Sequence, residues 1–203
     1  RCYTYLRALG KDGIKKMSAV AVLSARYLYQ KLNTTYPVLP IGSDITPRMH
    51  EFILTLSDET FTKVANSGTP KAQAIAKVGK LFLDFGFHAP TVAFPEVYGL
   101  MLEPTESFTK SELDGFSEVV KTIHRMIVEY PEILKTVPHF TPIDKVDEVL
   151  ANKNPVITEE IPQKLPEVLK DRVDANKLRN MSQTEIIEQI LVTHKEKLAD
   201  LDA

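Results

Sequence analysis

The chain has 203 residues, of which 43% are hydrophobic and 26% are charged, a composition that is typical of a globular protein and excludes wholesale disorder. Its net charge of −2 argues against nucleic-acid binding through bulk positive charge, and no run approaches the roughly 20 apolar residues of a membrane span. The single cysteine, Cys2, excludes an internal disulfide and a cysteine-built zinc site, and therefore favours a reducing, cytoplasmic setting.

The first part of the chain alternates between helical and extended patterns. An apolar period free of glycine and proline predicts a long helix over residues 14–32. Two prolines confine the extended segment 36–40 to a sheet edge or a loop, and strand formers predict a strand over residues 49–56. Residues 57–68 are interpreted as a polar region, and the next apolar period predicts a helix over residues 70–85.

Two glycines bear on the helix predicted over residues 70–85, one inside it and one at its end. Gly79 costs about 1 kcal/mol relative to alanine inside a helix, so its presence indicates a close approach to a neighbouring segment. Gly86 is a natural C-terminal stop. After the turn that follows, an extended piece is expected at residues 92–94 and a strand at residues 98–102.

Helical signals dominate the rest of the chain. Capping boxes at residues 109–112 and 182–185 each predict the start of an amphipathic helix. The helix that follows residue 109 is expected to end at residues 130–131. A short helix is expected over residues 141–150, and three prolines indicate a linker over residues 152–166. Few strands and segregated helices predict an α+β fold with a small, mostly antiparallel sheet covered by helices, and a helical tail.

Taken alone, the residues offer little catalytic signal. The glycine-rich phosphate-binding patterns GxGxxG and GxxxxGK[ST] are both absent. His50 begins a His-Glu pair, but Leu54 stands where a second zinc-binding histidine would be needed, so no metal site is predicted. His124 and His194 are interpreted as structural or surface histidines.

Two turns stand out as places where chemistry could be presented. Residues 87–91 put an imidazole and a hydroxyl on a rigid turn directly after a helix stop, which could present both groups to a pocket. Residues 103–107 form an acidic turn after a strand. From spacing alone, ordinary connection and capping chemistry is the favoured explanation of each turn, and presentation to a pocket stays open as the alternative.

Five stretches occur in a recognisable order. They are LRALG at residues 6–10, PVL at 37–39, HEF at 50–52, LDFGFHAPTV at 83–92 and LEPTES at 102–107. This series resembles the C-terminal part of glycine dehydrogenase (decarboxylating), the P-protein of the glycine cleavage system, and FGFHAPTV with EPTES is specific in combination. Residues 141–149 resemble the end of the separate second subunit of two-subunit bacterial and archaeal versions. The likeness covers residues 1–157, which are expected to form one small domain, and leaves residues 158–203 as a divergent linker and helical tail.

The resemblance implies a pyridoxal 5'-phosphate (PLP) enzyme with the aspartate-aminotransferase-like fold (fold type I). In this family glycine loses its carboxylate as CO2 while the cofactor takes up the electrons, and the aminomethyl group passes to the lipoyl arm of H-protein. The family's cofactor lysine lies upstream of the matching stretches. The dipeptide His194-Lys195 repeats that lysine's local sequence, but it stands in the divergent tail and is rejected as a counterpart.

The chain is therefore expected to be the small C-terminal domain of a longer protein. It should hold no catalytic lysine, bind no PLP covalently and be inactive by itself. The implied partners are lipoylated H-protein, glycine, and the N-terminal part or partner subunit of the P-protein. Neither nucleic acid nor a membrane is expected as a partner.

By their place in the motif, His88, Ala89, Pro90 and Thr91 are expected to face the substrate, the cofactor or the lipoyl channel. The resemblance implies that His88 hydrogen-bonds a carboxylate or a cofactor group, and that Thr91 orients that group. Arg48 is a further candidate, for the carboxylate of glycine. Structural support of the turn is assigned to the other motif residues, which are His50, Glu51, Glu103, Thr105 and Glu106.

Two other readings remain. The proline-rich linker and the amphipathic helix after residue 182 suggest a non-catalytic interaction module, in which that helix packs on a partner. The second alternative is a PLP enzyme with the same fold and a different substrate, although the pair FGFHAPTV and EPTES argues against it. Truncation at Pro155 separates the first reading from the main one, because it shows whether the tail belongs to the core.

Overall fold

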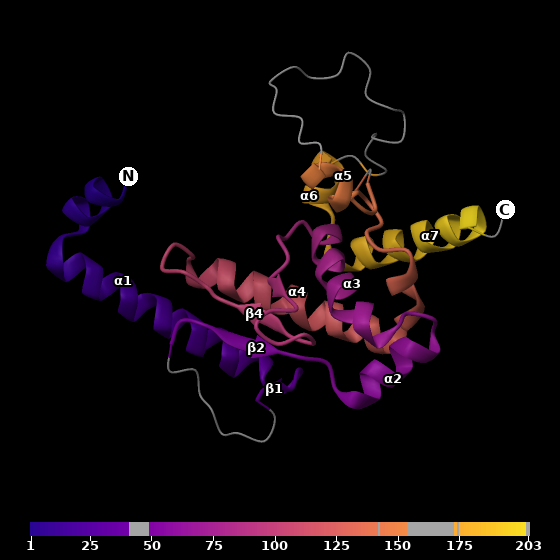
Figure 1. Ribbon diagram of the computed structural model, residues 1–203, viewed down its shortest axis with the longest axis horizontal. Coiled ribbons are helices and arrows are strands. Elements are labelled where there is room, and N and C mark those ends of the chain that lie inside the picture. The colour runs from indigo at the N-terminus through magenta and orange to yellow at the C-terminus, as the bar shows by residue number, and fades with distance from the viewer. Residues whose placement is uncertain (41–48, 142, 154–172, 174, 202–203) are drawn as a thin grey trace, which may run out of the picture.

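The computed structural model describes residues 1–40, 49–141, 143–153, 173 and 175–201 (Figure 1). Among the described residues, no helix combines the length and the apolar character of a membrane span. The elements follow in the order α1 (Cys2–Leu32), β1 (Val38–Leu39), β2 (Phe52–Leu54), α2 (Asp58–Asn66), α3 (Lys71–Asp84), β3 (Thr91–Val92), β4 (Leu100–Leu102), α4 (Lys110–Glu129), the 3-10 helix η1 (Pro131–Lys135), α5 (Glu148–Lys153), α6 (Ala175–Asn180) and α7 (Gln183–Leu201).

The four short strands form one sheet in the order β1-β2-β4-β3, with every neighbouring pair antiparallel. In the central pair, Phe52 lies opposite Leu102 and Leu54 lies opposite Leu100. Strand β1 is at the edge, where the prolines that flank it remove no hydrogen bond from a second neighbour. The prediction of an α+β fold with an antiparallel sheet is therefore confirmed.

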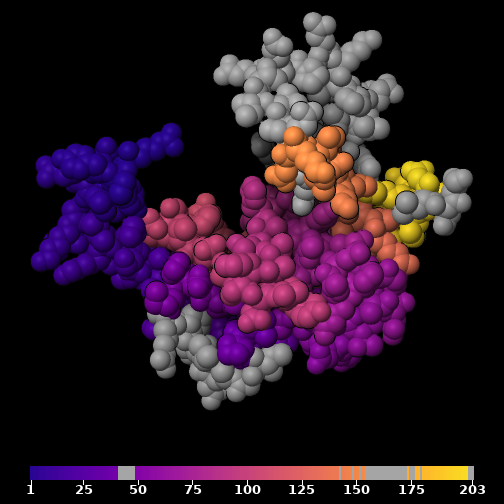
Figure 2. Space-filling view, in the orientation of Figure 1, coloured from indigo at the N-terminus to yellow at the C-terminus, as the bar shows by residue number. Residues whose placement is uncertain are grey.

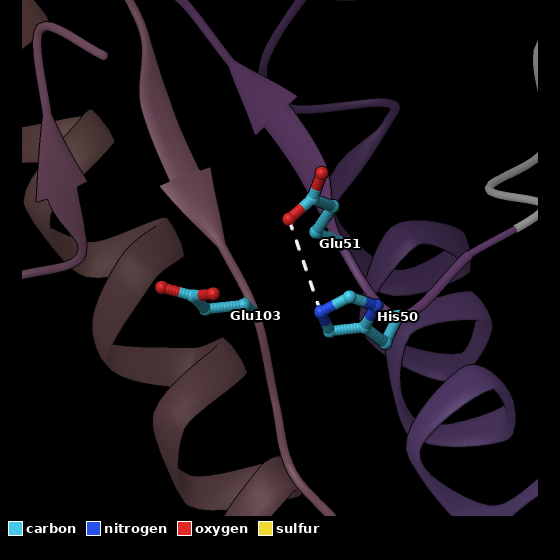
Figure 3. A group of neighbouring side chains, drawn as sticks. All are labelled: His50, Glu51 and Glu103. Atoms are coloured by element: carbon cyan, nitrogen blue, oxygen red, sulfur yellow. Dashed lines mark ion pairs between the residues drawn. The ribbon is translucent and has the colours of Figure 1, made fainter. Parts of the chain in front are cut away.

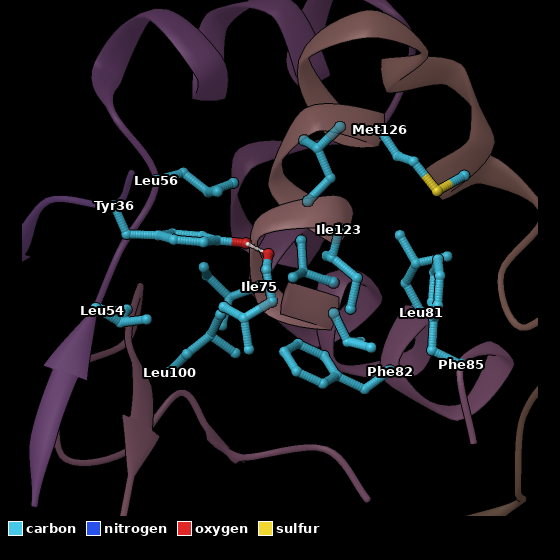
Figure 4. Packing of buried hydrophobic residues seen from close by; sticks show 14 of the residues in the cluster. Tyr36, Leu54, Leu56, Ile75, Leu81, Phe82, Phe85, Leu100, Ile123 and Met126 are labelled. Atoms are coloured by element: carbon cyan, nitrogen blue, oxygen red, sulfur yellow. Dashed lines mark hydrogen bonds between the residues drawn. The ribbon is translucent and has the colours of Figure 1, made fainter. Parts of the chain in front are cut away.

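Buried side chains of the sheet and the helices form a single cluster (Figure 4). At its edge Tyr36 is fully buried, and its hydroxyl donates a hydrogen bond of 3.1 Å to the carbonyl oxygen of Val120. Burial raises the pKa of Tyr36, so this hydroxyl remains a donor. The largest contributors are Leu28 and Leu32 of α1, Leu54 and Leu100 of the sheet, Ile75, Leu81 and Phe82 of α3, and Ile123, Met126 and Ile127 of α4. Helices α1, α3 and α4 and the two central strands thus supply the largest part of one shared core.

Helix α1 is longer than the predicted segment 14–32, because it begins at Cys2. It is kinked at Gly10, which has a positive φ of 61° that other residues rarely adopt. Residues 1–8 before the kink are all exposed, and the first part of α1 projects beyond the sheet and the other helices (Figure 2).

The polar region at residues 57–68 contains a helix that its composition did not reveal. Ser57 is the N-cap of α2, and its hydroxyl oxygen accepts a hydrogen bond from the Thr60 amide at 3.1 Å. Phe61 and Val64, one turn apart, bury that helix in the core. Two apolar positions are enough to bury a helix of nine residues, but they are too few for a periodic signal.

Both predicted capping boxes are present. The Thr109 amide donates to the Glu112 carboxylate at 2.7 Å, and the Ser182 amide donates to the Glu185 carboxylate at the same distance. The short helix expected over residues 141–150 is displaced, since α5 runs over Glu148–Lys153. Residues 154–166 of the expected linker, like Arg48, lie outside the described residues.

Helix α7 packs against α4 and η1 instead of standing apart. Ile186 is 6% exposed and Ile190 is fully buried, and both belong to the main hydrophobic cluster. The hydroxyl of Thr122 on α4 donates a hydrogen bond of 2.7 Å to the side-chain oxygen of Gln183. The apolar face that suggested an interaction module is thus covered within the chain.

Candidate functional site

The two motif turns line one open cavity of about 490 Å³. Residues 86–91 form one wall and residues 101–104 form another. Side chains from α1, α4 and the loop before α4 complete the lining, and they are Leu28, Phe108, Glu112, Leu113 and Phe116. Two segments about ten residues apart, each ambiguous by spacing alone, therefore meet at the same place.

The first wall starts with a well-defined helix end. Gly86 follows the last residues of α3 with a φ of 75°, which glycine adopts without strain. Its amide donates to the Leu83 carbonyl at 3.0 Å, and the Phe87 amide donates to the Phe82 carbonyl at 3.0 Å. This pair of bonds is the Schellman arrangement, and it turns the chain sharply into the cavity wall.

Aromatic rings connect that wall to the core. The Phe116 ring on α4 lies 5.6 Å from the Phe87 ring and 6.0 Å from the Phe82 ring. Because Phe82 is fully buried and Phe116 also lines the cavity, the same ring serves both the core and the cavity floor. The floor is therefore apolar and fixed.

The remaining residues of the turn differ in how far they are exposed to solvent. His88 and Thr91 are exposed, whereas Ala89 and Pro90 are half-buried. The Thr91 hydroxyl donates a long hydrogen bond of 3.4 Å to the Glu103 carboxylate on the opposite wall. The turn therefore leaves an imidazole and a hydroxyl accessible at the cavity mouth.

Gly79 sets how closely the turn approaches α3. A Cβ atom at this position would lie 2.7 Å from Cγ1 of Val92, the residue that pairs with Leu100 in the sheet. Real Cβ contacts essentially never fall below 3.0 Å. The close approach predicted from this glycine is confirmed.

A histidine and two glutamates adjoin the cavity (Figure 3). Glu51 precedes β2 and Glu103 follows β4, so the antiparallel pairing of these strands brings the two carboxylates to the same end. One ligand atom from each of His50, Glu51 and Glu103 lies within 4.8 Å of the others, and the His50 Nε2 atom is 4.0 Å from the Glu51 carboxylate. All three side chains are exposed.

The other two motif residues stabilise the acidic turn and tie it to α1. The Thr105 hydroxyl oxygen accepts a hydrogen bond of 3.2 Å from the Ser107 amide. The Glu106 carboxylate accepts one of 2.9 Å from the Tyr5 hydroxyl, and this bond raises the pKa of Tyr5. The exposed start of α1 is therefore attached to the turn at residues 103–107.

Sequence reasoning missed a buried polar network directly below the turn. Asp84, the last residue of α3, is fully buried, and its carboxylate accepts hydrogen bonds from the His139 amide at 2.8 Å and the Phe140 amide at 3.1 Å. The carboxylate also lies 2.7 Å from Nδ1 of His139, whose Nε2 is 3.0 Å from the Thr136 hydroxyl. That hydroxyl is 2.6 Å from Nδ1 of His194 on α7. His194 is thus buried, so of the two interpretations given from the sequence, the structural one applies and the surface one does not.

The network predicts a pH dependence of stability. Burial lowers the pKa of His194. The positive charges near it, from His139, Lys135 and Lys195, lower that pKa further, whereas Glu132 raises it. The folded chain therefore binds a proton at His194 less readily than the unfolded chain, whose histidine pKa is about 6.5. Because the unfolded state binds more protons in that window, the free energy of unfolding should decrease as pH falls below about 6.5.

Urea titrations of the chain and of His194→Asn, at about pH 7.5 and about pH 5, measure this effect. The loss of stability on acidification should be smaller in the variant, because it has no titrating group at position 194. His124, whose pKa burial also lowers, is unchanged in both proteins and so cancels. An equal loss in the two proteins would show that His194 does not contribute.

Comparison with known proteins agrees with the motifs. The family described as "Glycine dehydrogenase, C-terminal domain" matches residues 17–138, which include both motif turns and the second half of α1. Among curated proteins, "Probable glycine dehydrogenase (decarboxylating) subunit 2" of Pyrococcus furiosus is 40% identical over 163 residues, which is 78% of this chain and 30% of the relative.

The similarity extends to bacteria. The proteins with the same description from Caldanaerobacter subterraneus subsp. tengcongensis and Oceanobacillus iheyensis are 42% and 38% identical, each over 159 residues. Each alignment covers 77% of this chain and 30% of the relative. The chain thus spans about 30% of the length of the curated relatives it matches. The resemblance carried by FGFHAPTV and EPTES is confirmed, and the chain belongs to the glycine dehydrogenase C-terminal domain family.

Proposed function

We propose that this chain is the C-terminal part of a PLP-dependent glycine dehydrogenase (decarboxylating), in which its cavity closes one side of a site completed by the rest of the protein. The observation that carries the proposal is the meeting of the FGFHAPTV and EPTES segments along one open, largely apolar cavity. Within this proposal the fold is the small domain of a fold type I enzyme. Its place in the cell would be the cytoplasm.

The residues that line the cavity are suited to contacting the cofactor from one side, and not to binding it covalently or through its phosphate. Phe87, Phe108 and Phe116 supply apolar and aromatic surface, while His88 and Thr91 supply hydrogen-bonding groups. Neither lysine nor arginine is among the described residues of the lining, so the lining itself offers no amine for the cofactor's carbonyl carbon and no cation for its phosphate. When bound, PLP supplies a sink for the electrons released as glycine loses CO2.

In this proposal, the residues of the chain bind and orient a ligand and exclude water from it. The exposed imidazole of His88 can hydrogen-bond a carboxylate at the cavity mouth, and the Thr91 hydroxyl, directed by Glu103, can orient the same group. The apolar floor around Phe116 excludes water from the reacting group. The covalent lysine belongs to the N-terminal part or a partner subunit, and lipoylated H-protein receives the aminomethyl group.

Glycine-dependent CO2 exchange by the chain assembled with its N-terminal part, PLP and lipoylated H-protein tests the proposal. Because positioning and proton-transfer groups typically contribute about 100-fold or more, His88→Ala should lower kcat/KM by about 100-fold. Glu118→Ala is the control, since this exposed residue of α4 lies outside the cavity.

The isolated chain provides a second readout. Mixed with PLP, it should show no Schiff-base absorbance band and no activity. Such a band, or an unchanged kcat/KM in His88→Ala, would contradict the proposed role.

A further inference from the structure

Four buried polar groups connect the tail helix to the cavity wall. Asp84, His139, Thr136 and His194, here called the buried relay, are each 5% exposed or less. We propose that α7 acts as a clamp, in which His194 holds the turn at residues 85–91 in position through the buried relay. The clamp itself is independent of the enzymatic role, and only its effect on catalysis rests on the proposed function.

Each contact of the relay pairs a donor with an acceptor. The Asp84 carboxylate only accepts hydrogen bonds, so Nδ1 of His139 donates to it. The single proton of the Thr136 hydroxyl goes either to the Ile133 carbonyl, at 3.2 Å, or to Nε2 of His139, at 3.0 Å. Either arrangement leaves the Thr136 oxygen to accept a hydrogen bond from Nδ1–H of His194, at 2.6 Å. The relay therefore connects α7 to the end of α3 by a continuous run of hydrogen bonds.

A second contact from α7 fixes the same segment. Nζ of Lys197 donates to the carbonyl oxygens of Thr136 at 2.7 Å and Pro138 at 3.0 Å, and it pairs with the Asp144 carboxylate at 2.8 Å. The Lys197 side chain is only 12% exposed. Helix α7 therefore holds residues 136–138 through both their backbone and a side chain.

The other end of the relay explains why the turn should respond. Asp84 sits at the C-terminus of α3, where the helix dipole disfavours a negative charge. Its three donors all come from His139 and Phe140, which directly follow the residues 136–138 that α7 holds. If those donors move, the end of α3 is the first part to lose its stabilisation, and the Schellman turn begins two residues later at Gly86.

The clamp also gives the tail a role. Residues 17–138 match the family, whereas His139 of the loop and His194 and Lys197 of α7 lie beyond that match. The tail would then add rigidity to a turn that the family motif itself supplies. In the assembled enzyme, this rigidity would help His88 and Thr91 to meet their ligand.

Amide hydrogen exchange of the full chain tests the clamp at individual residues. In His194→Leu, the amides of Phe85, Gly86 and Phe87, which are bonded to the last turn of α3, should exchange about tenfold faster. His194→Asn should leave these rates within about twofold, because its amide group can replace the Nδ1–H donor. Glu188→Leu is the matched control, since it places the same side chain at an exposed position of α7.

The pattern of exchange decides the outcome. The amide of Ile53, in the distant pairing of β2 with β4, should keep its rate in every variant. Faster exchange confined to α7 and η1 would overturn the proposal, because α7 would then be anchored without holding the turn. Equally faster exchange throughout the chain would overturn it too, since the effect would be global destabilisation.

A measurement on the unsubstituted chain avoids any question of whether a variant folds. Nitrogen-15 spectra of the imidazoles should show His194 protonated at Nδ1, the donor to Thr136, and His139 protonated at Nδ1, the donor to Asp84. A His139 without a proton on Nδ1 would overturn the clamp, because its bond to Asp84 would then be absent. Activity of the assembled His194→Leu enzyme is a separate measurement: faster exchange at the turn with unchanged kcat/KM would leave the clamp intact and contradict the proposed role of the turn.

Discussion

Replacing Asp84 with alanine is expected to lower the free energy of unfolding by about 3–5 kcal/mol, the usual cost of removing one partner from a buried charged network. The substitution leaves the amides of His139 and Phe140 and the His139 imidazole without their acceptor, in a region shielded from water. The deleted carboxylate also leaves a small void, which adds to the loss.

Urea unfolding followed by circular dichroism measures the change, provided the slope against urea concentration stays constant. Asp12→Ala is a suitable control, because Asp12 is exposed on α1 and surface substitutions usually change stability by less than about 0.5 kcal/mol. A loss below about 1 kcal/mol in Asp84→Ala would mean that water or a rearranged loop replaces the carboxylate.

Removal of residues 155–203 is expected to have the second large effect. The deletion takes Ile186 and Ile190 out of the core, and burial of each such side chain contributes about 1.5–3 kcal/mol. It also removes the hydrogen bond of Gln183 with Thr122 and the contacts of His194 and Lys197. The summed loss is about 4 kcal/mol or more, a large fraction of the stability of a typical domain.

The truncated chain should therefore unfold at a lower urea concentration and expose apolar surface on α4 and η1. Binding of a hydrophobic dye and the unfolding midpoint report both effects. Deletion of residues 1–8 is the control, because these residues are exposed and their bond from Tyr5 to Glu106 lies at the surface. If the chain without residues 155–203 keeps its midpoint and binds no dye, the tail is a separate appendage and the boundary near residue 157 divides two independent units.

The parts of the fold that could be predicted are those encoded within a few neighbouring residues. Gly86 and the capping boxes at Thr109 and Ser182 define helix ends by local hydrogen bonds, so their positions follow directly from the sequence. Helix α2 was missed because tertiary burial of Phe61 and Val64, rather than a full apolar period, stabilises it.

The buried relay could not be predicted in the same way. Two of its three links join residues 55 and 58 positions apart along the chain, so no local pattern connects Asp84 with His139 or Thr136 with His194. One signal was available: Asp84 is a charged residue among apolar neighbours at a helix C-terminus, where it is unfavourable without a partner. The motif turns were selected because their residues resemble a family, whereas spacing alone left their role open.

The shared ring of Phe116 has a consequence for how this domain could diverge. Since its ring touches both Phe82 of the core and Phe87 of the cavity wall, a smaller residue there would admit a bulkier ligand only by loosening the interior. Ligand size and thermal tolerance are therefore coupled at one position. A lineage that evolved a roomier chamber through this residue would need a compensating substitution around α3 to keep the same melting temperature.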